Sequence, residues 1–218
     1  MKKNTAFPIT LLISILIFSC TLQPKKKEKA ANPENELFIV DETFCIDKNL
    51  PKIEFSVEYP KHMKFLPAKP SEFPNQNYAI MGKYRNASTI LEAIQIEALY
   101  ATDSSKKKID KQKTLRYILK GYRNFFASFT GETGVFKVNG KEYAMMRGKV
   151  EGRFYGTNAG TLTGKYLIQS VIVMGNEETS KGIVLTMMAD QERTEIKTYD
   201  DFVTKGDLGE IWQTLEFY

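Results

Sequence analysis

Histidine is almost absent from this chain, and its scarcity limits the chemistry that the sequence can support. His62 is the only histidine among 218 residues. A Ser-His-Asp triad would have to use it, yet the sequence holds no G-x-S-x-G nucleophile motif. P-loop and G-x-G-x-x-G patterns are missing too, so no phosphate-binding loop is predicted. We therefore predict no catalytic residues and no cofactor, and we interpret His62 as a surface side chain on a loop after Pro60.

A large excess of one charge sign is also missing. The chain has 31 Lys and Arg against 26 Asp and Glu, a net charge of +5 that falls to +3 (29 minus 26) without Lys2 and Lys3. Nucleic-acid-binding domains usually concentrate basic residues on one face, so this balance predicts no nucleic-acid partner. The apolar fraction of 42%, with 14 Phe and 11 Tyr, is sufficient for a folded core.

No hydrophobic run is long enough to span a membrane. The longest, Ala6–Ser19, would reach roughly 21 Å as a helix, against about 30 Å for a hydrocarbon core. Lys2 and Lys3 precede it, which is typical of a secretory signal. The run ends in Ile17-Phe18-Ser19-Cys20, which resembles the lipobox of bacterial lipoproteins, with an aliphatic residue three before the cysteine and a small residue directly before it.

The resemblance implies that Cys20 becomes the acylated first residue of the mature protein. Several acyl chains anchor firmly, because each buried methylene contributes about 0.8 kcal/mol. We therefore predict a signal peptide (1–19), the lipidated cysteine with a disordered tether (20–36) and one domain (37–218). An ordinary cleaved signal or a short uncleaved anchor remains an alternative. The protein is expected in the bacterial cell envelope. Thr21 stands where many lipoproteins that are retained at the inner membrane have Asp, so the outer membrane is favoured. The sequence does not indicate whether the domain lies on the periplasmic or the surface side.

Only Cys45 remains once Cys20 is acylated. The domain must then be stable without an intramolecular disulfide, and we interpret Cys45 as a buried free thiol, with an intermolecular bridge as the alternative. Only His62 and Cys45 remain as His or Cys ligands, fewer than the three or four of a zinc site built from these residue types, so we predict no metal site.

The strongest helical pattern lies at Thr114–Phe129. Asp110 is the candidate N-cap, Gly131 a candidate C-terminal stop, and Gly121 predicts a close approach to a neighbouring element. The apolar residues have the spacing of one helical stripe and predict a helix that covers one face of a sheet: Leu115, Ile118, Leu119, Tyr122, Phe125, Phe126 and Phe129.

Most of the remaining chain alternates as β-strands do. Leu37–Ile46 is expected to be a strand or extended arm, and Lys61–Asn77 to be irregular because of its prolines. Asn139-Gly140 is a strong hairpin signal within a β-meander. The predicted strands are Ile53–Tyr59, Tyr78–Tyr84, Ala93–Tyr100, Val135–Val138, Tyr143–Gly156, Lys165–Met174, Gly182–Ala189 and Leu215–Phe217, with mixed helical signals in Thr198–Gln213.

This order predicts an α+β fold in which helices pack on an antiparallel sheet. It resembles the PsbP-like family of α/β/α sandwiches, which implies that fold and supplies no shared catalytic residues. Many relatives carry a tryptophan where this chain has His62-Met63-Lys64-Phe65. The resemblance covers roughly Ile53–Tyr218 and is carried by Phe55-Ser56-Val57-Glu58-Tyr59-Pro60, Phe125-Phe126, Tyr166-Leu167-Ile168-Gln169-Ser170, Gly182-Ile183-Val184-Leu185-Thr186 and Ile211-Trp212-Gln213-Thr214-Leu215-Glu216-Phe217.

One charged stripe on the meander is a candidate contact surface: Arg147, Lys149, Glu151 and Arg153. A solvated sheet face explains the same alternation. Gly148 lies on the opposite, apolar face, where close packing by a helix explains a glycine. Methionines in the meander indicate core filling, with adaptable binding of an apolar partner as the alternative.

Three functional hypotheses follow. The first is a lipid-anchored, non-enzymatic envelope protein whose domain binds or supports a protein partner. The second is a carrier or sensor of a small apolar ligand held between sheet and helix, which would need an enclosed apolar pocket. The third is an enzyme of unrecognised type that uses His62 with nearby acids or lysines and predicts a cleft that contains His62.

Overall fold

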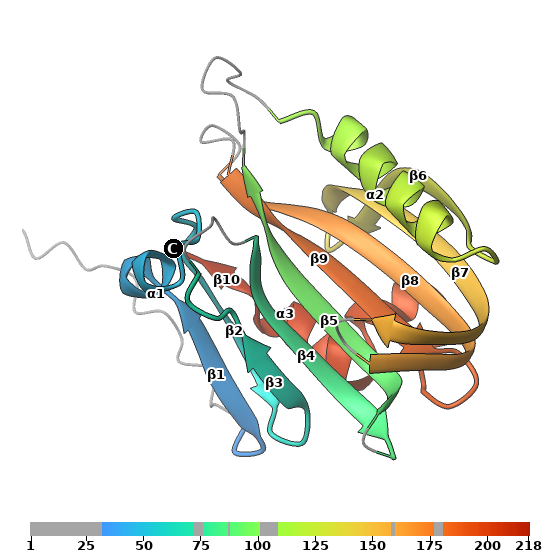
Figure 1. The fold of residues 1–218 in the computed structure, drawn as a ribbon. Helices are drawn as coiled ribbons and strands as arrows, with labels where there is room; N and C mark the ends of the chain where they lie inside the picture. Colours follow the sequence, from blue (N-terminus) through green and yellow to red (C-terminus); the bar gives the residue numbers. More distant parts are fainter. Residues whose placement is uncertain (1–31, 72–75, 87, 101–108, 158–159, 177–180) are drawn as a thin grey trace, which may run out of the picture. The chain divides into compact units, whose positions relative to one another are not determined.

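Two β-sheets dominate the protein. A computed structural model describes residues 32–71, 76–86, 88–100, 109–157, 160–176 and 181–218 (Figure 1). The three-stranded sheet has the order β1 (Asn35–Val40), β2 (Phe55–Pro60), β10 (Glu216–Phe217). The seven-stranded sheet has the order β3 (Lys64–Pro67), β4 (Asn77–Arg85), β5 (Thr89–Tyr100), β9 (Lys181–Asp190), β8 (Gly160–Asn176), β7 (Lys141–Thr157), β6 (Thr130–Val138).

Few helices accompany these strands. They are α1 (Glu42–Asp47), α2 (Lys111–Phe125), the 3-10 helix η1 (Asp200–Val203) and α3 (Gly206–Thr214). Neighbouring strands in both sheet orders pair antiparallel, and a single parallel bridge joins Thr89 to Thr161. The predicted mixed α+β class with antiparallel sheets is therefore confirmed. The predicted signal peptide, Cys20 and most of the tether lie outside the described residues. The predicted end of the tether at Glu36 is wrong, because Asn35 and Glu36 already pair with β2 as the start of β1.

The predicted meander is present. Strands β6, β7, β8 and β9 are consecutive antiparallel neighbours. Asn139 and Gly140 join β6 to β7 with φ angles of 50° and 76°. Both angles lie in the left-handed region that a tight two-residue hairpin requires, which explains the Asn-Gly pair.

The predicted helix exists, with different bounds. The Asp110 carboxylate accepts a hydrogen bond from the Lys113 amide at 2.8 Å, so the N-cap prediction is confirmed. The helix ends at Phe125, because Phe126 has extended backbone angles. Gly131 lies in β6 and does not end the helix. The prediction for Gly121 is also wrong, since this residue is exposed and an added Cβ would meet no heavy atom within 4 Å.

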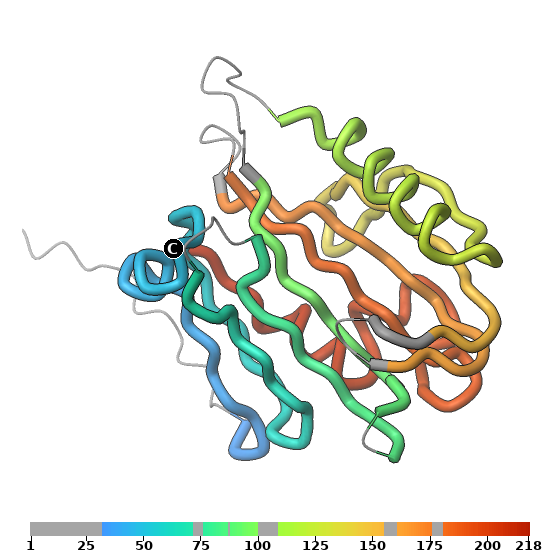
Figure 2. The backbone as a smooth tube through the Cα atoms, viewed as in Figure 1, coloured from blue at the N-terminus to red at the C-terminus, as the bar shows by residue number. Residues whose placement is uncertain are grey.

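The N-terminal third contains two elements that the sequence pattern did not predict. Glu42–Asp47 forms α1, capped by the Asp41 carboxylate, where the pattern predicted a strand or arm through Ile46. Lys64–Pro67 forms β3 within the stretch expected to be irregular, because pairing with β4 overrides the nearby prolines. Figure 2 traces how the chain returns at its end to β2, where Glu216 pairs with Ser56.

Alternate residues of the seven-stranded sheet enter two separate buried clusters. Since successive strand residues point to opposite faces, the clusters lie on opposite faces. One contains Ile94, Ile96, Leu167, Val171, Leu185 and Met187 together with residues of β1, β2, η1 and α3. The other contains Leu115 and Leu119 of α2 together with Ala93, Met146, Val150, Ile168, Ile172 and Val184.

Candidate functional site

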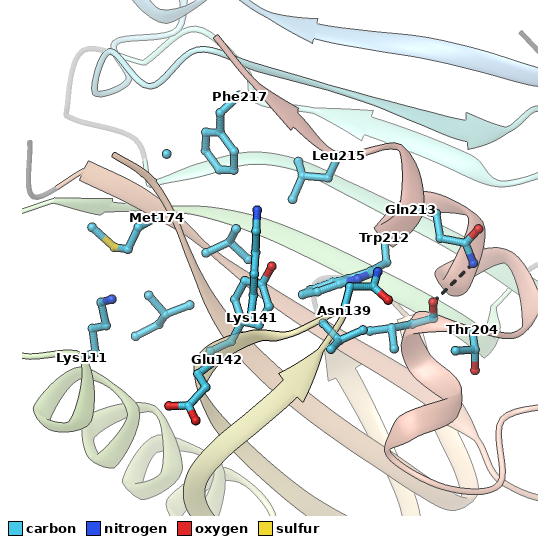
Figure 3. A pocket seen from close by; sticks show the side chains of 16 residues that line it. Lys111, Asn139, Lys141, Glu142, Met174, Thr204, Trp212, Gln213, Leu215 and Phe217 are labelled. Atoms are coloured by element: carbon cyan, nitrogen blue, oxygen red, sulfur yellow. Dashed lines mark hydrogen bonds between the residues drawn. The ribbon is translucent and has the colours of Figure 1, made fainter. Parts of the chain in front are cut away.

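An open cleft of about 920 Å³ lies where the β6–β7 hairpin, the end of β8 and the C-terminal segment meet (Figure 3). Segments distant in the sequence form it, so each wall comes from a different part of the chain. The apolar part of its lining consists of Val138, Tyr143, Ile172, Val173, Met174, Val203, Trp212, Leu215 and Phe217.

Aromatic packing fixes the position of Trp212, the only tryptophan. Its ring makes edge-to-face contacts with Tyr143 and Phe136, at centroid distances of 5.4 Å and 6.2 Å. Phe217 lies on the opposite wall against Gly175, where an added Cβ would come within 2.7 Å of the Phe217 ring. The aromatic side chains are therefore held in place by the fold, and such rigid rings favour binding of apolar groups.

The rim of the cleft is polar and carries a lysine without an ionic partner. Glu142 pairs with Lys137 at 2.6 Å, and the Gln213 amide donates to the Val203 carbonyl oxygen at 3.4 Å. Lys141 lines the cleft from the hairpin and makes no ion pair within the described part of the chain. The cleft therefore combines apolar walls with a polar lining that is slightly larger in exposed area, Lys141 has no ionic partner among the described residues, and the lining contains no histidine or cysteine.

The predicted charged stripe is only partly assembled as a surface. Arg147 donates to the Glu132 carboxylate at 2.8 Å, and its guanidinium lies 5.3 Å from the Tyr199 ring centroid. Arg147 and Lys149 line a shallow open cavity of about 460 Å³ with Glu132 and Tyr199. Glu151 and Arg153 of the same stripe do not line it. Arg147 thus has partners within the domain, and the stripe stays a predicted contact surface.

A charged cluster near the start of α3 was not predicted. The Asp207 carboxylate lies 2.7 Å from His62 Nε2 and 3.2 Å from Lys83 Nζ. His62 is more than half exposed, as expected, but Asp207 is buried. The sequence around either residue does not predict this contact, because 145 residues separate His62 from Asp207.

Glu92 connects the cluster to the backbone of α3. Its carboxylate is buried and accepts hydrogen bonds from the Asp207 and Leu208 amides at 3.0 Å and 3.3 Å. Gly206 has a φ of 62°, and an added Cβ would lie 2.8 Å from Glu92 Oε2, so both the turn and the space require glycine. Burial, reinforced by the nearby Asp207 charge, raises the pKa of Glu92 above its ordinary value.

A cavity of about 560 Å³ adjoins this cluster. Lys83, Glu92 and Asp207 line it, whereas His62 does not. The enzyme hypothesis predicted a cleft that contains His62, and this cavity contains only its partners. Across the described ranges, no group of three or more His, Cys, Asp or Glu side chains is placed to hold a metal ion.

Cys45 and the meander methionines serve the core. Cys45 is buried and free, as predicted, and burial raises the pKa of its thiol, which keeps it in the unreactive form. Met145, Met146 and Met187 are buried, which agrees with core filling.

No protein-family model matches the chain, and no curated protein matches it. Among solved structures, the Saccharomyces cerevisiae Ran-binding protein Mog1p is similar at 10% identity and a TM-score of 0.41. The match covers 84% of this chain and 95% of that chain. No helix within the described residues is both long and apolar enough to cross a membrane.

Proposed function

We propose that this chain is a lipid-anchored, non-enzymatic cell-envelope protein whose domain binds a protein partner in the cleft beside Trp212. The anchor follows from the lipobox-like end of the leader at Cys20. Binding follows from one observation, the open cleft whose apolar walls include two mutually packed aromatic side chains, Tyr143 and Trp212. The outer membrane is the proposed location, because Thr21 replaces the Asp of inner-membrane retention.

The proposed occupant is an extended segment of a protein with an apolar side chain and an acidic group. The apolar side chain would contact Trp212, and the acidic group would lie near Lys141. Enclosed pockets bury most of a small ligand, whereas this cleft is only partly enclosed. Its openness favours a macromolecular segment over the carrier of a small apolar ligand.

The charged cluster at Asp207 supports a structural role. Glu92 satisfies two amides at the start of α3, and the charge on Asp207 has both Lys83 and His62 beside it. Glu92 therefore holds the start of α3 to β5, and Asp207 holds it to Lys83 of β4 and to His62. This arrangement supports the non-enzymatic proposal, since the cavity beside Asp207 is not lined by His62.

At the level of fold, we propose a PsbP-like α/β/α sandwich. The order of elements supports it, as do the two buried clusters, one with α2 and one with α3 on opposite faces of the seven-stranded sheet.

Two measurements test the function. The intact mass of protein purified from its native membrane should correspond to cleavage before Cys20 plus acyl chains, and an unmodified product would overturn the anchor. Co-purification after gentle solubilisation should recover one specific partner. Lys141→Glu should lose that partner, whereas Arg85→Glu, the same charge change at an exposed site outside the cleft, should retain it. Repeated recovery of a lone monomer would refute the binding role.

A further inference from the structure

The outward face of α2 carries cations and no anion. The helix reads KQKTLRYILKGYRNF, with five Lys or Arg residues and no Asp or Glu. Leu115 and Leu119 are buried, so the face opposite them is the one exposed to solvent. Because residues three and four apart are neighbours on a helix, that face presents one continuous stripe, which we call the α2 basic face: Lys113, Arg116, Tyr117 and Lys120.

No described residue neutralises the cations of this face. Lys113, Arg116 and Lys120 are exposed and make no ion pair with any described residue. Arg123, at the end of the helix, differs because it donates to the Gly131 carbonyl oxygen at 2.8 Å. Elsewhere, exposed cations such as Lys137 and Lys52 have carboxylate partners at 2.6 Å and 3.0 Å.

Two aromatic side chains accompany the cations. Tyr117 lies within the α2 basic face and is 80% exposed, and Phe125 at the end of the helix is 58% exposed. At 100° per residue, Phe125 lies roughly 120° around the helix from Lys113, toward the buried side, so Tyr117 is the ring that lies among the cations. Cations flanking exposed aromatic rings are typical of helices that lie on a membrane surface, where the rings enter the headgroup region.

We propose that the α2 basic face docks on an anionic lipid bilayer. This inference rests on the proposed function in one respect, that the acylated Cys20 keeps the domain near the membrane. The predicted tether, shortened to Thr21–Glu34 because β1 begins at Asn35, would have a root-mean-square span of roughly 20 Å but would set no orientation. The basic face supplies the orientation, because anionic headgroups attract juxtamembrane cations and leave the other faces of the domain in solvent.

A lysine-labelling experiment tests the orientation on the full lipidated protein. The protein is reconstituted in phosphatidylcholine vesicles with and without about 30% phosphatidylglycerol, and each lysine is labelled with a membrane-impermeant amine reagent. Labelling of Lys113 and Lys120 should slow several-fold on the anionic vesicles, and about 0.5 M salt should restore it by screening. Lys64, exposed on the edge strand β3, serves as the internal control and should label equally in both.

A charge-reversal variant separates docking from anchoring. Lys113→Glu, Arg116→Glu and Lys120→Glu together should abolish the protection. Without the anchor, the protein should bind phosphatidylglycerol vesicles about a hundredfold less tightly when it carries these changes, since each cation contributes roughly fivefold. The matched control reverses Lys64, Arg85 and Lys181, which are exposed outside the α2 basic face, and should bind as the parent does.

The outcomes are distinguishable. Equal labelling of Lys113 on both vesicles overturns the docking, whatever the intact mass says about the anchor. Protection in native membranes without protection on phosphatidylglycerol vesicles also overturns it, in favour of an acidic protein partner. If the protein purified from its native membrane is unacylated, the anchor is refuted, and binding of that protein to anionic vesicles through this face would still support the docking.

Discussion

Replacing Gly121 by alanine should stabilise the domain. Gly121 lies in the interior of α2 on the solvent side, and an added methyl group would meet no heavy atom within 4 Å. The substitution therefore adds no clash and removes only the helix penalty of glycine, about 0.8–1.0 kcal/mol relative to alanine. For a domain of this size, thermal unfolding followed by circular dichroism should show a midpoint higher by roughly 2–4 °C.

Gly148→Ala is the matched control with the opposite sign. Gly148 lies in β7, where an added Cβ would collide with the Phe129 ring and approach the Thr130 carbonyl oxygen to 2.8 Å. Overpacking of this kind costs about 1–3 kcal/mol. The same assay should therefore show a higher unfolding midpoint for Gly121→Ala and a lower one for Gly148→Ala. A lower midpoint for Gly121→Ala would show that another surface packs on α2 at this position and would refute the reasoning.

Three further predictions concern buried polar side chains. Gln169 is fully buried and its amide has no hydrogen-bond partner among the described residues, so Gln169→Met should raise the free energy of unfolding in urea by about 1–3 kcal/mol; a decrease would indicate a partner for the amide. Because the pKa of Glu92 is raised in the folded state, protonation of this residue favours folding. Its contribution to the free energy of unfolding is therefore fully present below the unfolded-state pKa and is lost as the pH rises through the folded-state pKa. Glu92→Gln should remove that decline in unfolding measured from about pH 4 to 8, and an unchanged slope would contradict the assignment. Burial opposes ionisation of Asp201, but the Lys205 ammonium and the Lys197 and Thr198 amides outweigh this effect and lower the pKa of Asp201. Asp201→Asn should therefore lower the free energy of unfolding by about 1–3 kcal/mol at neutral pH and by less in acid.

Local patterns predicted the elements whose causes are local. The α2 helix, its Asp110 cap and the Asn139-Gly140 hairpin each depend on residues within one or two turns of each other. The four meander strands were also predicted, because alternation reports burial of one face. Bounds were less accurate: the helix ends before Phe126, whose ring still enters the buried cluster from the following segment.

Elements stabilised by distant partners were missed. β3 is a strand because β4 pairs with it, and the intervening prolines gave the opposite signal. α1 has only six residues, too short for a helical period to appear in the sequence. The predictions for Gly121 and Gly131 failed for a related reason, since a glycine gives no indication of which neighbour, if any, approaches it.

The candidate site could not be predicted from the sequence either, because it too depends on residues that are distant along the chain. Its walls come from residues 138–143, 172–175, 203–204 and 212–217, which only the fold brings together. The contact between His62 and Asp207 likewise spans 145 residues. The charged stripe was visible as an alternation, but the partners of Arg147 on β6 and at Tyr199 were not.

The cleft and the α2 basic face are connected at the start of α2. Lys111 lines the cleft, and Lys113, two residues later, belongs to the exposed face. Because residues two apart on a helix point to opposite sides, Lys111 and the cleft lie across α2 from Lys113, so a bilayer on the basic face would be about one helix diameter, roughly 10 Å, from that end of the cleft. The proposed partner would then present its binding segment near the bilayer. Cross-linking from a photoreactive group at position 141 should accordingly recover a membrane-associated protein, and recovery of only freely soluble proteins would break the connection between the two surfaces.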